Sequence, residues 1–415
     1  MKKNNTYIDI NKIFWKVVSE PDLLIMLPFA IFLFPLIIIL RPILLIRFGF
    51  FHSDRLGHFA VNSEIFFCEQ KKFERIKIMK IDLYYFPIKP CNEQLGKMIS
   101  RKVTILPRIF IRPFDLISRS LPFLNKHVTG RPSNSDYDTN HVLQNMKLQI
   151  PLTSTENAKG REILRKAKID HNKIICIGVR DNSYLKKKYA DQDFSYHDHR
   201  NDNINKYVPG INYLLSKGYT VLRMGSVTNR KLKINHKKFL DYSYSNIKSD
   251  FMDVYLSSIC KLFISNNTGI DALAIIFRRP VLHVGSIPAG AISTFTNKFY
   301  NTMSNYYSLK NKKILSLSEI FKFKIQYSWH KKEFDQKQIK VLHPSKYEIF
   351  EYFKEIHNIL EKKKRKKRDL IMEKKFKKNF VKCINLYPPH KLRYHNKIKT
   401  NFLYSFLKSN KHLFL

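Results

Sequence analysis

The chain has 415 residues, 44% of them hydrophobic, so it is long enough for two domains and too apolar to be disordered. Lysine and arginine number 75 against 33 aspartates and glutamates, and the net charge of +42 points to an acidic partner such as an anionic membrane or a phosphorylated substrate. Nucleic acid would also fit this charge, but the basic residues are spread along the chain and the sequence contains no helix-turn-helix, zinc-finger or aromatic RNA-binding motif, so we expect no nucleic-acid partner.

An uncharged apolar run of 18 residues, Leu23–Leu40, lies near the N-terminus. It just reaches the length of a membrane-spanning helix, about 20 residues for a hydrocarbon core of about 30 Å. A signal peptide would end in a small-residue cleavage site, whereas Arg41 and Pro42 follow here. We therefore expect residues 1–40 to anchor the chain in the inner membrane. Pro28 and Pro35 would kink the helix, so it either crosses the bilayer or dips into one leaflet, and the basic residues after it keep the rest cytoplasmic.

A first α/β domain is predicted over residues 41–130. A short apolar strand followed by glycine, a loop and a helix is the opening of a Rossmann-like unit. The predicted strands are 42–48, 75–82 and 102–106, and the predicted helices are 59–70 and 92–100.

A polar linker is predicted over residues 131–155, and a second α/β domain over 156–330. Strands that recur every 20 to 40 residues with helices between them predict a parallel sheet with right-handed crossovers. The predicted strands are 173–179, 220–224, 261–265 and 280–284, and the predicted helices are 156–167, 204–216, 250–258 and 270–277. We expect Asp250 to cap the third of these helices. Residues 331–415 are predicted to form a C-terminal helix, capped by Ser345 with Glu348, and a basic tail.

The loop after the first strand is dense in polar chemistry. It contains His52, Asp54, Arg55, Gly57 and His58 within seven residues and leads into a helix. Ligands of open α/β sheets bind beyond the carboxyl ends of strands, and Asp54 or either histidine is a candidate general base. Arg55 and Gly57 are candidate substrate contacts. A salt-bridged surface loop would have the same composition.

Three loops of the second domain follow predicted strands in the same way and contain groups that bind phosphate. An arginine at a strand end can form a forked pair of hydrogen bonds with a phosphate, and a glycine at a helix start lets the backbone approach an anion. The candidate residues are Arg180, Arg223, Gly225, Asn267, Thr268 and Gly269, with His199 and Arg200 as possible substrate contacts. Charged loops and simple capping turns remain the alternative.

The runs RFGFFHSDRLGHFAVNSE, CNEQL, VRDNSY, YHDHRNDNINKYVPGINYLLSKGYTVLRMGS and SDFMDVYLSSICKLFISNNTGID resemble a family of bacterial glycosyltransferases found with surface-polysaccharide genes. The resemblance covers residues 41–288. The last run also resembles, more distantly, the donor-phosphate region of heptosyltransferases. The resemblance implies a GT-B architecture with two Rossmann-like domains, an N-terminal acceptor domain, a nucleotide-sugar donor and a glycan or lipid-linked acceptor.

A metal-dependent GT-A transferase is an alternative, because Asp136-Tyr137-Asp138 and Asp191-Gln192-Asp193 have the Asp-x-Asp form that holds Mn²⁺. Neither triplet follows an apolar strand, so we expect no metal and no cofactor. A sugar-binding scaffold without activity is another alternative, and only an activity assay distinguishes it.

Overall fold

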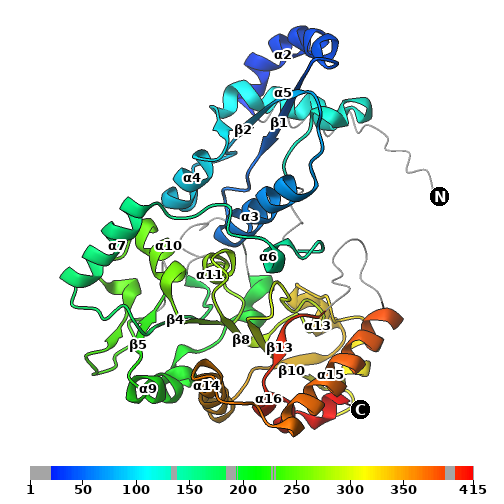
Figure 1. Cartoon of the computed structure of the whole chain (residues 1–415). Helices are drawn as coiled ribbons and strands as arrows, with labels where there is room; N and C mark the ends of the chain where they lie inside the picture. The colour runs from blue at the N-terminus through cyan, green and yellow to red at the C-terminus, as the bar shows by residue number, and fades with distance from the viewer. Residues whose placement is uncertain are drawn as a thin grey trace. The chain divides into compact units, whose positions relative to one another are not determined.

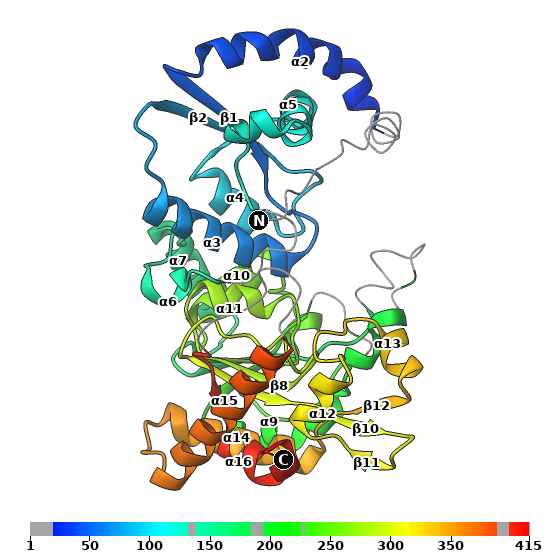
Figure 2. The ribbon, with the colours of Figure 1, turned by 90° about the vertical axis from the view of Figure 1, so that its right-hand side faces the viewer.

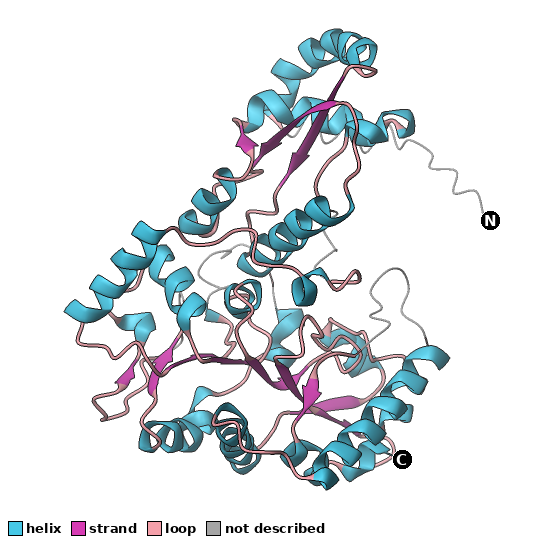
Figure 3. Cartoon of the chain, viewed as in Figure 1, coloured by secondary structure: helices cyan, strands magenta, loops and turns pink. Residues whose placement is uncertain are grey.

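The computed structural model describes residues 20–131, 138–183, 193, 195–225, 228, 230–387 and 398–414. The chain divides into two compact units, unit 1 (Met1–Asp136) and unit 2 (Tyr137–Leu415). In each unit, helices pack around a parallel sheet, as the colouring in Figure 3 shows. The predicted α/β class with parallel sheets is therefore confirmed, and so is an N-terminal apolar helix.

Unit 1 is built on a parallel sheet in the order β1-β2-β3. Its strands are β1 (Leu44–Phe50), β2 (Met79–Tyr85) and β3 (Thr104–Ile105). Its helices are α2 (Pro21–Leu40), α3 (Leu56–Phe73), α4 (Glu93–Ser100), α5 (Arg108–Ser120) and the 3₁₀ helix η1 (Pro122–His127). Helix α5 was not predicted, because Pro113 lies in its interior and a proline normally ends or kinks a helix.

Unit 2 contains a seven-stranded parallel sheet in the order β13-β9-β8-β7-β4-β5-β6 and a small antiparallel sheet in the order β11-β10-β12. The large sheet consists of β4 (Ile174–Gly178), β5 (Thr220–Arg223), β6 (Phe239–Leu240), β7 (Leu262–Ser265), β8 (Val281–Ser286), β9 (Phe299–Met303) and β13 (Asn401–Phe402). The small sheet consists of β10 (Asn305–Ser308), β11 (Lys313–Ile314) and β12 (Ile339–Leu342).

Helices cover both faces of the large sheet. Figure 1 shows α10 and α11 on one face and α9 and α14 on the other. The α-helices of unit 2 are α6 (Val142–Asn145), α7 (Ser154–Lys166), α9 (Val208–Ser216), α10 (Asp250–Ile259), α11 (Asp271–Ile276), α12 (Leu317–Lys322), α13 (Lys331–Gln336), α14 (Lys346–Leu360), α15 (Lys367–Leu386) and α16 (Tyr404–Ser409). Its 3₁₀ helices are η2 (Ser195–Arg200), η3 (Ile204–Tyr207), η4 (Tyr242–Tyr244) and η5 (Lys411–Phe414).

Two details differ from the sequence expectations. Ser249, rather than Asp250, caps α10, because the Ser249 side chain accepts the hydrogen bond from the Met252 N–H while Asp250 lies in the first turn. Residues 331–415 are part of unit 2 rather than a separate tail, since β13 pairs with β9. Ser345 caps α14 with Glu348, as its capping box predicted.

The strand order creates a switch point in the large sheet. From β4 the chain moves to β5 and β6 on one side, and it then returns to β7, β8 and β9 on the other. The loops after β4 and β7 therefore leave the sheet in opposite directions, which opens a crevice at their carboxyl ends. Open α/β sheets bind their ligands at such a point.

Candidate functional site

The loops after β4 and β7 meet at this switch point. The backbone N–H of Arg180, the second residue after β4, donates to the side-chain oxygen of Asn266, the first residue after β7, at 2.7 Å. Gly178 ends β4 here, and a Cβ on it would lie 3.4 Å from the Thr268 hydroxyl. Asn266 thus joins the loop that contains Arg180 to the loop that contains Asn267 and Thr268. Its role was missed, although its place directly after an apolar strand was the available signal.

Arg200, at the end of η2, lies against the same loop. The Asn266 amide donates to the Arg200 carbonyl at 3.2 Å, and the Arg200 guanidinium donates to the Asn267 carbonyl at 3.3 Å. The guanidinium also lies over the ring of Trp329, 4.8 Å from its centroid. Asn267 has a left-handed φ of 63°, which turns the chain between β7 and Thr268. The structure therefore brings Arg180, Arg200 and the Asn267 loop together.

The positive charges of Arg180 and Arg200 act on each other at this place. Burial and the positive charge of Arg180 lower the pKa of Arg200 to about 9, and only Asp271 opposes them. Among the described residues, the Arg200 Nε and the Thr268 hydroxyl are buried without a hydrogen-bond partner. Buried polar groups are normally satisfied, so these two atoms lack the partner that an anion would supply. Two guanidiniums and a free hydroxyl at a strand edge form an arrangement suited to phosphate.

The neighbouring histidines are neutral. Burial, the charge of Arg200 and the charge of Arg180 lower the pKa of His197 to about 3. Burial and the charge of Arg200 likewise lower the pKa of His199 to about 4. The two arginines therefore supply the positive charge of this site at neutral pH, and His199 faces it as an uncharged ring.

A buried network holds the base of the β7 loop. Ser265, the last residue of β7, donates to the Asp271 carboxylate at the start of α11, and the His283 ring lies 3.0 Å from the same carboxylate oxygen. All three side chains are buried. Since α11 has six residues, its dipole is short, and the loop geometry rests on this network rather than on the helix. Thr268 and the solvent-exposed Gly269 lie in the turn between β7 and α11.

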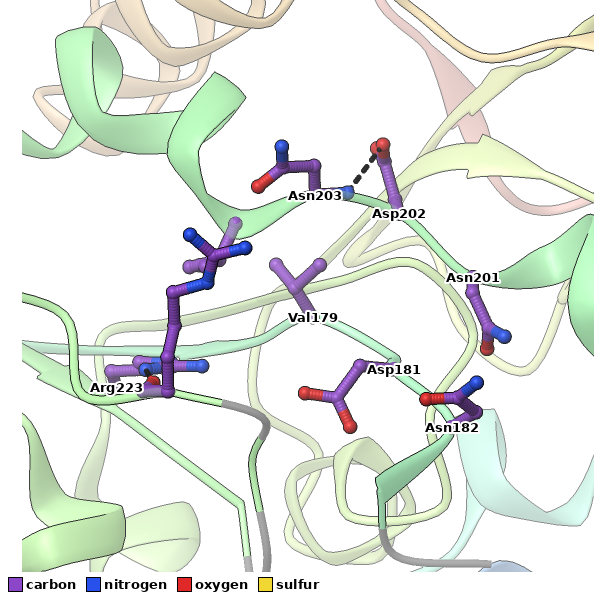
Figure 4. A pocket seen from close by; sticks show the side chains of 9 residues that line it. Val179, Asp181, Asn182, Asn201, Asp202, Asn203 and Arg223 are labelled. Carbon is purple, nitrogen blue, oxygen red and sulfur yellow. Dashed lines mark hydrogen bonds between the residues drawn. The ribbon is translucent and has the colours of Figure 1, made fainter. Parts of the chain in front are cut away.

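A polar pocket of about 440 Å³ adjoins the ends of β4 and β5. Figure 4 shows its wall of carboxylates, amides and an arginine. It is lined by Val179, Asp181, Asn182, Asn201, Asp202, Asn203, Ile204, Arg223 and Arg230. Its carboxylate and amide oxygens suit the hydroxyl groups of a ribose or a sugar.

The predicted donor contacts Arg223 and Gly225 belong to this pocket region rather than to the arginine pair. Arg223 donates to Asp241 at 3.1 Å and to the Arg230 carbonyl at 2.6 Å, in an ion pair with both side chains almost fully buried. Gly225 has a φ of 148°, and a Cβ there would lie 3.0 Å from Thr228. Both residues shape the turn after β5, and Arg223 is already paired.

The polar loop of unit 1 follows β1 as predicted. Two hydrogen bonds of Ser53 connect this loop to the segment after β2. The Ser53 hydroxyl donates to the Ile88 carbonyl at 2.8 Å, and the Cys91 N–H donates to the Ser53 carbonyl at 2.8 Å. Asp54 is half-exposed, with its carboxylate 3.7 Å from the Arg55 guanidinium.

His52 packs edge-on against Phe50, and burial, followed by the charge of His58, lowers its pKa. Gly57 and His58 lie in the first turn of α3. A half-exposed carboxylate beside a neutral imidazole is a suitable pair for proton transfer.

The Asp-x-Asp triplets fall partly outside the described residues, which include Asp138 and Asp193 only. Asp138 is buried and accepts hydrogen bonds from the Val142 and Leu143 N–H groups, so it caps α6. Asp193 accepts from the Ser195 N–H and hydroxyl. Within the described ranges, no group of three or more His, Cys, Asp or Glu side chains is placed to hold a metal ion.

No protein-family model and no curated protein sequence matches the chain. Its structure is similar to ADP-heptose LPS heptosyltransferase II of E. coli, with 12% identity and a TM-score of 0.34, covering 57% of this chain and 84% of that one. It is similar to a family 9 glycosyl transferase of Veillonella parvula, with 10% identity and a TM-score of 0.38, covering 60% and 82%. It is also similar to UDP-GlcNAc 2-epimerase of Methanocaldococcus jannaschii, with 12% identity and a TM-score of 0.31, covering 62% and 89%. At these TM-scores the overlaps are partial, so the argument for function rests on the site itself.

Proposed function

We propose that the protein is a glycosyltransferase that moves a sugar from a nucleotide-sugar to a surface-polysaccharide or lipid-linked acceptor without a metal ion. The observation that carries this proposal is the arginine pair, Arg180 and Arg200, beside the unpaired Thr268 hydroxyl at the switch point of unit 2. The resemblance of the sequence motifs to bacterial glycosyltransferases supports the same function.

In this reaction the acceptor hydroxyl forms a bond to the anomeric carbon as the bond from that carbon to the diphosphate oxygen breaks. The electron pair leaves with the nucleoside diphosphate, whose negative charge grows in the transition state. Fixed positive groups that face this charge lower the barrier. Arg180, Arg200 and the Thr268 hydroxyl are the groups of unit 2 that would receive the diphosphate. The adjoining pocket, with Asp181 and its amides, would receive the hydroxyl groups of the donor.

The acceptor proton needs a base, and we propose Asp54 of unit 1 for this role, with His52 and His58 beside it. The Asp54 side chain is half-exposed, so an acceptor hydroxyl can approach it. Asp54 lies in the loop after β1, at the carboxyl end of the strand, where open α/β sheets bind their ligands. Arg55 and Gly57 lie in the same loop as candidate acceptor contacts.

The proposal is tested by titrating nucleoside diphosphates and nucleotide-sugars into the full chain by calorimetry, with EDTA present. We expect binding that survives EDTA and release of the nucleoside diphosphate when a suitable acceptor is supplied. If no nucleotide binds at any ionic strength, the proposal fails. Loss of binding on adding EDTA would instead favour the metal-dependent alternative.

We further propose that α2 attaches the protein to the cytoplasmic face of the inner membrane, where a lipid-linked acceptor would be found. The supporting observations are the uncharged helix Leu23–Leu40, 17% of which is buried, and the net charge of +42. Replacing Phe29, Phe32 and Leu36, which are more than half exposed on α2, by serine is expected to release the protein from membranes at high salt.

A further inference from the structure

Helix α2 is apolar on all sides, and its packing divides it into two faces. The buried face includes Leu23, Ala30 and Phe34. Phe34 packs against Phe48 of β1 and Phe114 of α5, with ring centroids 6.2 and 6.1 Å apart. One side of α2 therefore belongs to the core of unit 1, and Figure 2 shows the helix arching over α5.

The N-terminal end of α2 is fixed to α5 by ion pairs. Glu20, the residue before the helix, pairs with Arg108 and, at 3.2 Å, with Arg112. These contacts and the packing of Phe34 hold the helix along the surface of unit 1 from one end to the middle. A helix that stood across a bilayer would have to give up both, leaving the Phe34 side of the unit 1 core uncovered.

The opposite face of α2 is an apolar stripe exposed to solvent. Ile25, Phe32 and Ile39 are spaced seven residues apart, or about two helical turns, and are 69%, 80% and 72% exposed. Phe29 and Leu36 lie between them in the same stripe, and both are more than half exposed. A helix that is apolar all round is normally buried all round, so this stripe, together with Ile43 just beyond it, needs an apolar cover.

Basic residues lie beside α2. Arg41 directly follows the helix, and burial together with the charge of Arg41 lowers the pKa of His127 of η1, whose ring packs against Phe34 on the buried face. Lys126 is exposed on η1 next to His127. An exposed apolar helix face with basic residues nearby, in a chain of net charge +42, complements an anionic bilayer, whose acyl chains lie beneath negative headgroups.

We infer that α2 lies flat in one leaflet of an anionic bilayer, with the stripe Ile25, Phe29, Phe32, Leu36, Ile39 and Ile43 among the acyl chains and its other face still packed on unit 1. This inference rests on the proposed membrane attachment and is independent of the sugar transfer. In this arrangement α2 does not span the bilayer. Both ends of α2 and all of unit 1 lie on the same side of the membrane.

The test measures the depth of three positions along the stripe. Ile25, Phe32 and Ile39 are replaced singly by cysteine in the full chain, with Cys91, the only cysteine that is not buried, changed to serine. Each variant is spin-labelled and bound to vesicles of phosphatidylcholine with phosphatidylglycerol. The relative accessibility of the label to oxygen and to a water-soluble nickel chelate then reports its depth.

A helix that lies flat gives the same shallow depth at all three positions. A spanning helix places position 32 deepest and positions 25 and 39 near the two surfaces, because seven residues of helix rise about 10 Å. A middle label that lies about 10 Å deeper than both ends would overturn the inference. Failure of the wild-type chain to bind the vesicles would overturn it together with the membrane attachment, while nucleotide titration would still test the sugar transfer separately.

A matched pair of variants tests whether the stripe itself binds the membrane. Ile25→Ser, Phe32→Ser and Ile39→Ser together should weaken vesicle binding by more than tenfold. Leu370→Ser with Ile371→Ser on α15 of unit 2, where both side chains are also about half exposed, should leave it unchanged. Equal losses in both would refute a specific docking face. A dimer in light scattering that the triple variant abolishes, without any loss of vesicle binding, would show that a second copy covers the stripe instead.

Discussion

Replacing Arg200 by methionine should separate stability from ligand binding at the candidate site. The pKa of Arg200 falls from the ordinary 12.5 to about 9, and at about 1.4 kcal/mol per pKa unit this corresponds to roughly 5 kcal/mol of unfavourable free energy for the charged form. The side chain keeps some contact with solvent, and methionine loses the hydrogen bond to the Asn267 carbonyl. We therefore expect the free energy of unfolding of the ligand-free variant to be unchanged or raised by up to about 2 kcal/mol.

The same substitution should weaken nucleoside diphosphate binding by about 1.5–3 kcal/mol, the scale of a hydrogen bond to a charged group. The assay is denaturant unfolding with and without nucleotide, combined with calorimetric titration. Arg165→Met on α7 is the matched control, because Arg165 is exposed and pairs only with Glu162 on its own helix. If Arg200→Met lowers the free energy of unfolding and leaves nucleotide affinity intact, Arg200 is a structural residue and the anion site is wrong.

Three further predictions follow from the site. Nucleotide-sugar affinity should stay constant between about pH 5.5 and 8, because the pKa values of His197 and His199 lie near 3 and 4 and neither ring gains charge in this range. An affinity that rises as the pH falls through 6.5 would show that a histidine supplies the positive charge that binds the diphosphate. Arg223→Met should lower the free energy of unfolding by about 3–5 kcal/mol in denaturant titration, because it leaves Asp241 buried without its partner, and an unchanged value would contradict the structural role. Asp54→Asn should reduce turnover by at least about 100-fold with little change in nucleotide affinity, whereas near-normal turnover in Asp54→Asn, His52→Gln and His58→Gln alike would exclude this loop as the source of the base.

The parallel strands of both units were predictable because their apolar runs are short, buried and bounded by polar loops. The predicted strand 261–265 is β7 (Leu262–Ser265), and the predicted strand 173–179 is β4 (Ile174–Gly178). Strand β13 was not predictable, because it has only two residues. Its pairing with β9 depends on the long helical segment that precedes it in the chain and returns it to the sheet. Helix α5 was missed because Pro113 lies in its interior, although its apolar and polar residues alternate with the helical period.

The candidate site shows the same division between local and long-range signals. Arg180, Thr268 and Asn267 were predicted because each directly follows an apolar strand. The position of Asn266 directly after a strand was visible in the sequence, but its bond to the Arg180 N–H and the contacts of Asp271 depend on the distance between loops, which one sequence without a known fold does not give. Arg223 is the last residue of a strand, yet its guanidinium is bound to Asp241, 18 residues on. Position after a strand therefore indicates where a side chain lies but not whether it is already paired.

A side chain that is held in an energetically unfavourable state in the ligand-free chain indicates a binding site more selectively than its residue type does. Arg180 follows β4 and Arg223 ends β5, but of these two arginines only Arg180 lies beside a second guanidinium, that of Arg200, whose pKa its charge lowers. Apolar side chains are exposed at many positions, but α2 presents them in a stripe along a helix whose other face is already in the core of unit 1. A bound anion or an apolar surface would offset the free energy of each of these unfavourable states. The arginine pair thus points to an anion and the stripe of α2 to lipid, each on grounds that a solvated charged loop or a buried core helix does not satisfy.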